Sequence, residues 1–422
     1  MKKQKVLTSA KSSLALIISC WLIYMIAYLT RNTYSASIVH LTGEGLINTS
    51  MAGLISTCYF ISYGCGHLIN GIIADRVSPV PMLSVGIIGT ALANLLMPMV
   101  IPSVPAMIAV WTANGFFESM LWAPIVVLFS SVIVGELCHS AMAAISLSRP
   151  VGQIMAYLFS AICAYFNVGI IPPFIIAAIC AAMTCVALVW IAKIVFSKPD
   201  VRIVEPILKK EDNRVAIGAL VKLLATSGAI IFMLPAIFHG MLKDGVNTWV
   251  PTFLRDAFQS SASLSTILAV ILPITGLFGV VFANFLLGRK ALLGNHPLIG
   301  IIIMLLTALP TAFLLNTKGI SLIVGVSCLC LISFFMESFN HVFSVMMPAK
   351  FASVRKAATV SGIFNSLIYI GSAISTYTFG TVAERVGWHM TTFLWLTLAL
   401  ISAVILAFSI KLWTRFSNPK PH

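Results

Sequence analysis

Long apolar runs, separated by short polar segments, make up most of this chain. A helix needs about 20 apolar residues to cross the hydrocarbon core of a bilayer, and each run reaches that length. The segments between the runs contain polar residues, Gly and Pro, which interrupt helices. The pattern predicts twelve membrane-spanning helices, near residues 13–41, 48–74, 79–100, 104–134, 140–165, 169–196, 215–253, 262–288, 296–316, 319–348, 357–383 and 388–412.

The longest polar stretch, Ser197 to Arg214, divides these runs into six and six. Two sets of six spans joined by a linker are typical of transporters built from parallel repeats. We therefore expect an all-α membrane protein of the major facilitator fold, with two pseudo-symmetric six-helix bundles. The predicted domains are an N-terminal bundle over 1–196, a cytoplasmic linker over 197–214 and a C-terminal bundle over 215–422.

The composition agrees with a membrane protein. Of the 422 residues, 59% are hydrophobic and 9% are charged, whereas about 25% of the residues of soluble domains are charged. The nine cysteines fall almost entirely within apolar runs and match no metal or redox spacing, so we expect neither a metal site nor disulfides. No phosphate-binding loop for ATP occurs in the sequence, and no cofactor is expected.

The net charge of +14 reports membrane topology. If the N-terminus is cytoplasmic, nineteen Lys and Arg residues fall on the cytoplasmic side, and only Arg255, Lys318 and Arg385 fall on the opposite side. Because basic residues concentrate in cytoplasmic loops, both termini are predicted to be cytoplasmic. The bilayer, and not a nucleic acid, is therefore the expected partner of this basic chain.

A few charged residues lie inside the predicted spans, where a charge costs about 2.5–3.5 kcal/mol at the helix centre. Such residues must face protein or water, and they are candidates for function. Helical spacing places polar neighbours on the same faces. The candidates for substrate binding are Arg31, Lys243, Arg149, Tyr28, Tyr24, Ser35, His239, Asn247, Asn365 and Tyr369, and the candidates for coupling or ion pairing are Glu118, Glu337, Asp244 and His341.

Each candidate also has a structural interpretation. Arg31 could serve only as an ion-pair partner, and Asp244 could neutralise Lys243. Glu118 and Glu337 could pair with a base, bind a coupled proton or cap a helix contact. A lone histidine within a helix is more often simply hydrogen-bonded than functional.

The segment GIIADRVSP, between the second and third predicted spans, indicates a conformational gate. Gly71 permits close approach of helices, and Asp75 can face a helix N-terminus. Arg76 can pair with Glu136 at the end of the fourth span. Contacts of this kind that form in one conformation only would bias the equilibrium between open states.

Several stretches resemble the organophosphate:phosphate antiporter family of the major facilitators. They are YLTRNTYSASIVHL, YGCGHLINGIIADRVSP, GMLKDGVNTWVPTFL and KAATVSGIFNSLIYIGSAISTYTFGTVAERVGW. The resemblance implies that one base from each half binds the substrate phosphate, and these positions match Arg31 and Lys243. The family's histidine in the fifth span matches Arg149. The chain departs from the family pattern twice, with Lys for Arg at 243 and Arg for His at 149.

We therefore predict a secondary transporter, and not an enzyme. It would move a small organic anion, a phosphorylated metabolite exchanged for inorganic phosphate, by alternating access around a central basic site. It is expected to act as a monomer in a cell membrane, the bacterial inner membrane. Two alternatives are a proton-coupled transporter of a neutral or zwitterionic solute that uses buried Glu and His, and a membrane sensor with the transporter fold.

Overall fold

The computed structural model describes residues 4–7, 10–74, 76–133, 136–197, 201–204, 217–351 and 357–417. The chain forms two compact units. Unit 1 comprises Met1–Leu41 and Cys58–Asn213, and unit 2 comprises Thr42–Thr57 and Arg214–His422. We describe each unit by itself.

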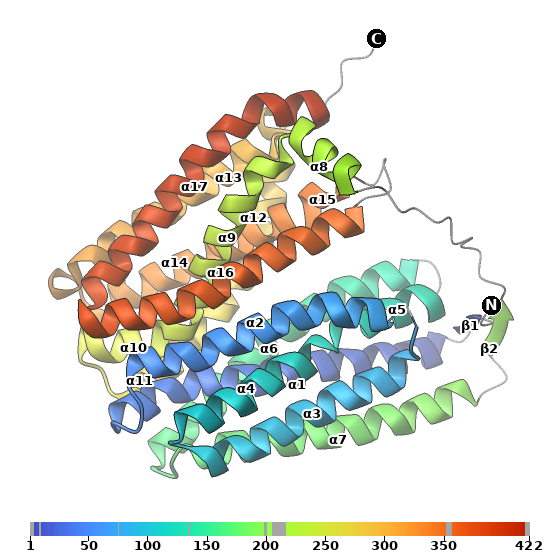
Figure 1. Cartoon of the computed structure of the whole chain (residues 1–422), viewed down its shortest axis with the longest axis horizontal. Coiled ribbons are helices and arrows are strands. Elements are labelled where there is room, and N and C mark those ends of the chain that lie inside the picture. The colour runs from blue at the N-terminus through green and yellow to red at the C-terminus, as the bar shows by residue number, and fades with distance from the viewer. Residues whose placement is uncertain are drawn as a thin grey trace. The chain divides into compact units, whose positions relative to one another are not determined.

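Long helices build unit 1 (Figure 1). Helix α3 packs against both α4 and α7, and α6 packs against α5 and α7. Helices α1 and α2 each cross the boundary between the two units. The helices are α1 (Ala10–Gly43), α2 (Thr49–Ala74), α3 (Pro79–Val100), α4 (Val104–Ser119), α5 (Trp122–Val132), α6 (Glu136–Tyr165) and α7 (Ile171–Phe196).

A short strand pair is the exception to the expected all-helical structure. Strand β1 (Gln4–Leu7) pairs antiparallel with β2 (Val201–Val204), with Gln4 opposite Val204 and Leu7 opposite Val201. The second strand falls within the predicted linker. Its sequence VRIV is rich in β-branched residues, which favour extended backbone.

In unit 2 the helices are more often interrupted. Helix α13 packs against α17, α12 packs against α14, and α9 packs against α16. The elements are α8 (Ile217–Thr226), η1 (Ala229–Phe232), α9 (Met233–Gly240), η2 (Met241–Gly245), α10 (Val246–Phe258), α11 (Ala262–Ala269), α12 (Ile271–Leu287), η3 (Lys290–Leu292), α13 (His296–Phe313), η4 (Leu314–Gly319), α14 (Leu322–Asn340), η5 (His341–Met346), α15 (Met347–Ala349), α16 (Ala357–Arg385) and α17 (Trp388–Ser417).

At least four of the predicted spans are not single continuous α-helices: the eighth divides into α11 and α12, and the tenth into α14, η5 and α15. The fourth span breaks between α4 and α5, directly after Glu118 and Ser119. Pro124 explains this break, because a proline ring clashes with the carbonyl four residues earlier, here that of Met120. The seventh span divides into five segments, of which η2 is a π-helix.

Glycines allow two of the helix contacts that position polar residues. A Cβ at Gly152 of α6 would collide with the Met25 carbonyl oxygen of α1. In unit 2, a Cβ at Gly240 would collide with the Ile368 carbonyl oxygen, and one at Gly371 with that of Ile237. Small residues that let backbones approach closely are typical of membrane helix interfaces.

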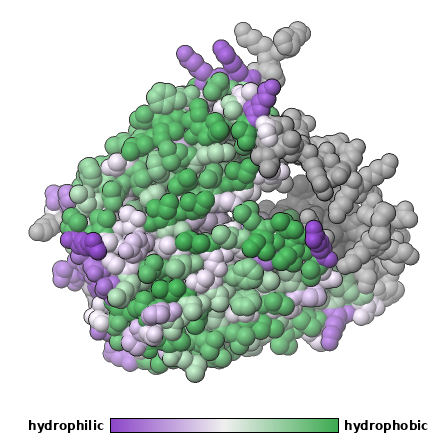
Figure 2. Space-filling view, viewed as in Figure 1, coloured by the Kyte–Doolittle hydropathy of each residue, from purple (hydrophilic) through white to green (hydrophobic). Residues whose placement is uncertain are grey.

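The expectation of an all-helical membrane protein is confirmed. Among the described residues, nine helices are long and apolar enough to cross a membrane. Large apolar side chains remain exposed along them, such as Val186 on α7 (70% exposed) and Phe408 on α17 (73% exposed). On the face shown in Figure 2, hydrophobic side chains cover most of the described surface. The count of twelve spans and the two-bundle arrangement stay predictions.

The first part of α2, up to Thr57, belongs to unit 2 and contacts α16. The Thr57 hydroxyl donates to the Ala373 carbonyl at 2.7 Å, and the Ser50 backbone N–H donates to the Glu384 carboxylate at 2.6 Å. A carboxylate beside the first turn of a helix also interacts favourably with the helix dipole. These contacts connect residues more than 300 positions apart in the sequence.

Candidate functional site

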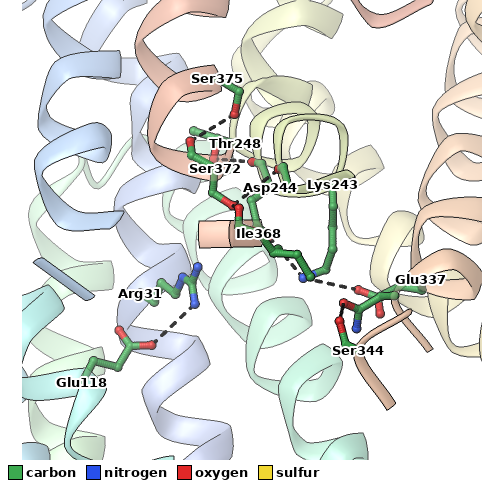
Figure 3. Close-up of polar contacts among 12 residues, drawn as sticks. Arg31, Glu118, Lys243, Asp244, Thr248, Glu337, Ser344, Ile368, Ser372 and Ser375 are labelled. Carbon is green, nitrogen blue, oxygen red and sulfur yellow. Dashed lines mark hydrogen bonds and ion pairs between the residues drawn. The ribbon is translucent and has the colours of Figure 1, made fainter. Parts of the chain in front are cut away.

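Unit 1 buries one of the predicted bases, Arg31, in the middle of α1. The side chain is only 9% exposed, and its Nη1 lies 3.9 Å from Oε1 of Glu118 on α4. Glu118 is itself buried and accepts a hydrogen bond from the Tyr59 hydroxyl. Figure 3 shows the Glu118 carboxylate pointing toward the guanidinium. The structure therefore brings together one base and one acid that the sequence analysis had selected separately.

Four aromatic rings surround the Arg31 guanidinium. Its Cζ lies 5.4 Å from the ring centroid of Tyr28, 5.3 Å from Tyr59, 4.9 Å from Phe60 and 5.0 Å from Tyr63. A cation within about 6 Å of a ring face is attracted by the ring quadrupole. The rings stabilise the positive charge in a setting from which bulk water is largely excluded. We call Tyr28, Tyr59, Phe60 and Tyr63 the aromatic cage.

Only one member of the aromatic cage, Tyr28, is predicted by the helical spacing around Arg31. Tyr59, Phe60 and Tyr63 lie on another helix, α2. The available signal was the run YFISY, which places three aromatic residues within five positions of a membrane span. The helix face that this run presents to α1 depends on packing, so the sequence alone did not connect it with Arg31.

The other candidates in unit 1 have differing surroundings. Tyr24 is buried and contacts the Tyr28 ring edge-on, with centroids 5.4 Å apart. Ser35 and Arg149 are half-buried. Arg149 lies on α6 three residues before Gly152, the point where α6 meets α1.

Unit 2 places the second predicted base, Lys243, in the π-helical segment η2. Short π-helical segments within α-helices occur frequently at functional sites. The Lys243 Nζ lies 3.4 Å from Oδ1 of Asp244 and 4.0 Å from Oε1 of Glu337 on α14. All three side chains are largely buried (Figure 3).

The two carboxylates beside Lys243 differ in what else they face. The second oxygen of Asp244 accepts a hydrogen bond of 2.7 Å from the Ser372 hydroxyl of α16. Glu337 instead lines a small pocket with Lys243 and Asn247. The other residues that line this pocket are Leu242, Val246, Ile332, Ser333 and Met336.

The remaining candidates of unit 2 occupy distinct surroundings. His239 is fully buried, and its ring centroid lies 4.9 Å from that of Phe339. His341 lies in the second π-helical segment, η5, and its Nε2 is 3.0 Å from Oδ1 of Asn284. Asn365 is exposed and donates to the Ser361 hydroxyl at 3.4 Å. Tyr369 is half-buried.

The predicted gate is only partly visible. Gly71 lies within α2, and Arg76 is exposed in the turn after it. Asp75 and the side chain of Glu136 lie outside the described residues, so the predicted pairing of Arg76 with Glu136 stays a prediction.

Comparisons with known proteins identify the family of the chain. The family described as Major Facilitator Superfamily matches residues 20–376. The chain is 22% identical to the probable hexose phosphate transport protein of Chlamydia trachomatis, over 92% of this chain and 88% of that protein. It is 23% identical to the glycerol-3-phosphate transporter of Bacillus subtilis, over 90% of this chain and 88% of that protein.

One further relative matches about a quarter of the chain, and one solved structure matches nearly all of it. The chain is 29% identical to the membrane sensor protein UhpC of Escherichia coli, over 24% of this chain and 23% of that protein. A crystal structure of a bacterial homolog of the human lysosomal transporter Spinster, inward-facing and occupied, superposes with a TM-score of 0.78. The superposition covers 98% of this chain and 100% of the Spinster homolog. At 14% sequence identity, the similarity shows a shared fold.

Proposed function

Because the chain belongs to the Major Facilitator Superfamily, it is a secondary membrane transporter, and we propose that its cargo is a small phosphorylated organic anion exchanged for inorganic phosphate. The full-length relatives named as hexose phosphate and glycerol-3-phosphate transporters support this cargo class.

One observation carries the proposal: each unit buries a basic side chain within a helix of membrane-spanning length. A buried charge in a membrane is costly and marks a functional site by default. An anionic cargo is the ligand that two such bases favour. Arg31 supplies a fork of N–H donors suited to phosphate oxygens, whereas Lys243 supplies a compact point charge.

The resident carboxylates support a cycle of exchange. Glu118 lies beside Arg31, and Glu337 lies beside Lys243. An incoming phosphate group displaces these carboxylates from the bases. When the anion leaves, the carboxylates form ion pairs with the bases again. Because the bases keep a negative partner throughout, neither buried base is left uncompensated, which would otherwise be strongly unfavourable.

Counterflow in proteoliposomes tests the proposal. Vesicles loaded with phosphate should take up labelled glucose 6-phosphate or glycerol 3-phosphate when they contain the protein. Arg31→Lys should lower this uptake strongly, because lysine keeps the charge but loses the bidentate fork. Arg385→Lys, the same exchange at an exposed residue, is the matched control and should retain uptake. Absence of exchange with any phosphate ester, or normal exchange by Arg31→Lys, would contradict the proposal.

A membrane sensor is the second candidate function, and the similarity to UhpC favours it. A sensor would bind a phosphate ester without moving it. Equilibrium binding of labelled glucose 6-phosphate to protein that shows no counterflow would support this candidate over the transporter.

A further inference from the structure

The pocket beside Lys243 offers a ligand one charged donor and several acceptors. Lys243 supplies the ammonium, and the ionised Glu337 carboxylate only accepts hydrogen bonds. The Ser333 hydroxyl donates to the Leu272 carbonyl oxygen at 3.1 Å, so its oxygen is left to accept from a ligand. Asn247 adds an amide, which can both donate and accept. Once an anionic group has bound Lys243, the rest of the ligand therefore meets mainly acceptors.

The two acids beside Lys243 are not equivalent toward a ligand. Asp244 lies 3.4 Å from the Lys243 Nζ, accepts a hydrogen bond from Ser372 of α16 and does not line the pocket. Glu337 lies 4.0 Å from the same Nζ and lines the pocket. Its side chain is 21% exposed, whereas that of Asp244 is 13% exposed. Glu337 is therefore the acid that a bound ligand contacts.

A phosphate group that binds Lys243 changes the surroundings of Glu337. The phosphate replaces Glu337 as the partner of the ammonium, and the displaced carboxylate stays in a largely buried pocket. A buried charge that loses its partner is strongly unfavourable. Donors on the cargo can compensate this carboxylate, because hydrogen bonds to an ionised acceptor are about twice as strong as those between neutral groups.

We propose that Glu337 selects the organic part of the cargo: it admits phosphate esters whose carbon chain carries hydroxyl groups and excludes those that carry a second carboxylate. This inference rests on the proposed function. Hydroxyl groups of the cargo donate to Glu337 and Ser333. A second carboxylate faces Glu337 as a like charge, and Lys243 is the one base among the described residues that line the pocket. Like-charge contacts of this kind suppress binding of the wrong ligand.

Two phosphate esters that differ at one carbon test this selectivity. Glycerol 3-phosphate ends in a hydroxymethyl group where 3-phosphoglycerate ends in a carboxylate, and the two are otherwise alike. Proteoliposomes that contain the full chain and are loaded with phosphate should take up both at low, equal concentrations. The wild-type protein should take up glycerol 3-phosphate faster than 3-phosphoglycerate by about tenfold or more. The ratio of these two initial rates is the measurement.

Four variants assign the ratio to the Glu337 charge. E337Q keeps the size of the side chain and leaves Lys243 paired with Asp244, and it should lower the ratio toward one. Glu337→Asp keeps the charge and should keep a ratio well above that of E337Q. Asp244→Asn removes a charge beside the same base but outside the pocket, and it should retain the wild-type ratio. Glu44→Gln, the same change at an exposed residue before α2, should also retain it.

Several outcomes would overturn selection by Glu337. They are equal or faster uptake of 3-phosphoglycerate by the wild type, an unchanged ratio in E337Q, and an equal fall of the ratio in Asp244→Asn, which would assign it to the net charge around Lys243. The wild-type comparison and Glu337→Asp decide the matter if E337Q does not fold. Absence of counterflow with every phosphate ester would instead contradict the proposed function itself, so the two failures can be told apart.

Discussion

At the scale of single residues, Arg31 is held by neighbours from three helices. Its own helix supplies Tyr28, α2 supplies the other rings of the aromatic cage, and α4 supplies Glu118. Each cation–π contact contributes about 0.5–2 kcal/mol, depending on how far the pair is removed from water. Tyr59 has two roles here, because its ring faces the guanidinium and its hydroxyl donates to Glu118.

Tyr59→Phe separates these two roles, because phenylalanine keeps the ring and loses the hydroxyl. Glu118 is only 3% exposed, and a buried acceptor that loses its donor costs about 1–3 kcal/mol. We expect a lower melting temperature for the purified protein in detergent. Tyr377→Phe, at an exposed tyrosine of α16, is the control and should leave the melting temperature unchanged. Equal melting temperatures for the two variants would show that the hydroxyl does not stabilise Glu118.

At the scale of elements, close backbone contact between α9 and α16 determines where η2 lies. Gly240 comes directly before η2 and packs against Ile368, and Gly371 packs against Ile237. Ser372, which follows Gly371, is thereby placed to donate to Asp244. The position of the ionic cluster of unit 2 depends on the absence of side chains at these glycines.

Gly371→Ala should destabilise the protein, because the new Cβ would collide with the Ile237 carbonyl oxygen. Overpacking of this kind costs about 1–3 kcal/mol. The thermal midpoint in detergent is the measurement. Gly362→Ala in the same helix is the matched control: nothing lies within 4 Å of the added carbon, and the change favours helix by about 0.5–1 kcal/mol. Equal midpoints for the two variants would exclude tight packing at Gly371.

At the scale of the whole molecule, each compact unit contains a buried base with an acid beside it. The acid follows the base in the chain in both cases, as Glu118 follows Arg31 and Glu337 follows Lys243. The predicted parallel repeat of six spans would produce this order. It requires that corresponding helices cross the membrane in the same direction, which the distribution of basic residues also predicts.

Labelling of engineered cysteines tests this topology. In a background with the nine native cysteines replaced by alanine, Val168→Cys in the loop after α6 should react with an impermeant maleimide added to intact cells. Leu293→Cys in the loop after α12 should react only after permeabilisation. Both positions are exposed, and the cysteine-free parent gives the background signal. Labelling of both from outside would contradict the predicted orientation.

The sequence by itself determined that this is a helical membrane protein with buried charges. Apolar runs of bilayer length can satisfy their backbone hydrogen bonds only as helices. Charges such as Arg31, Glu118, Lys243 and Glu337 stand out because they interrupt those runs. These features are local in the chain, so composition and spacing suffice to find them.

The tertiary structure alone decided which of these residues meet. The aromatic rings of α2 that surround Arg31, and the hydroxyl of Ser372 that holds Asp244, come from helices remote in sequence. The same applies to the difference between Asp244, which faces α16, and Glu337, which lines the pocket. The face that a helix presents to its neighbours depends on small residues, π-helical segments and proline breaks acting together, and these have no fixed spacing in the sequence.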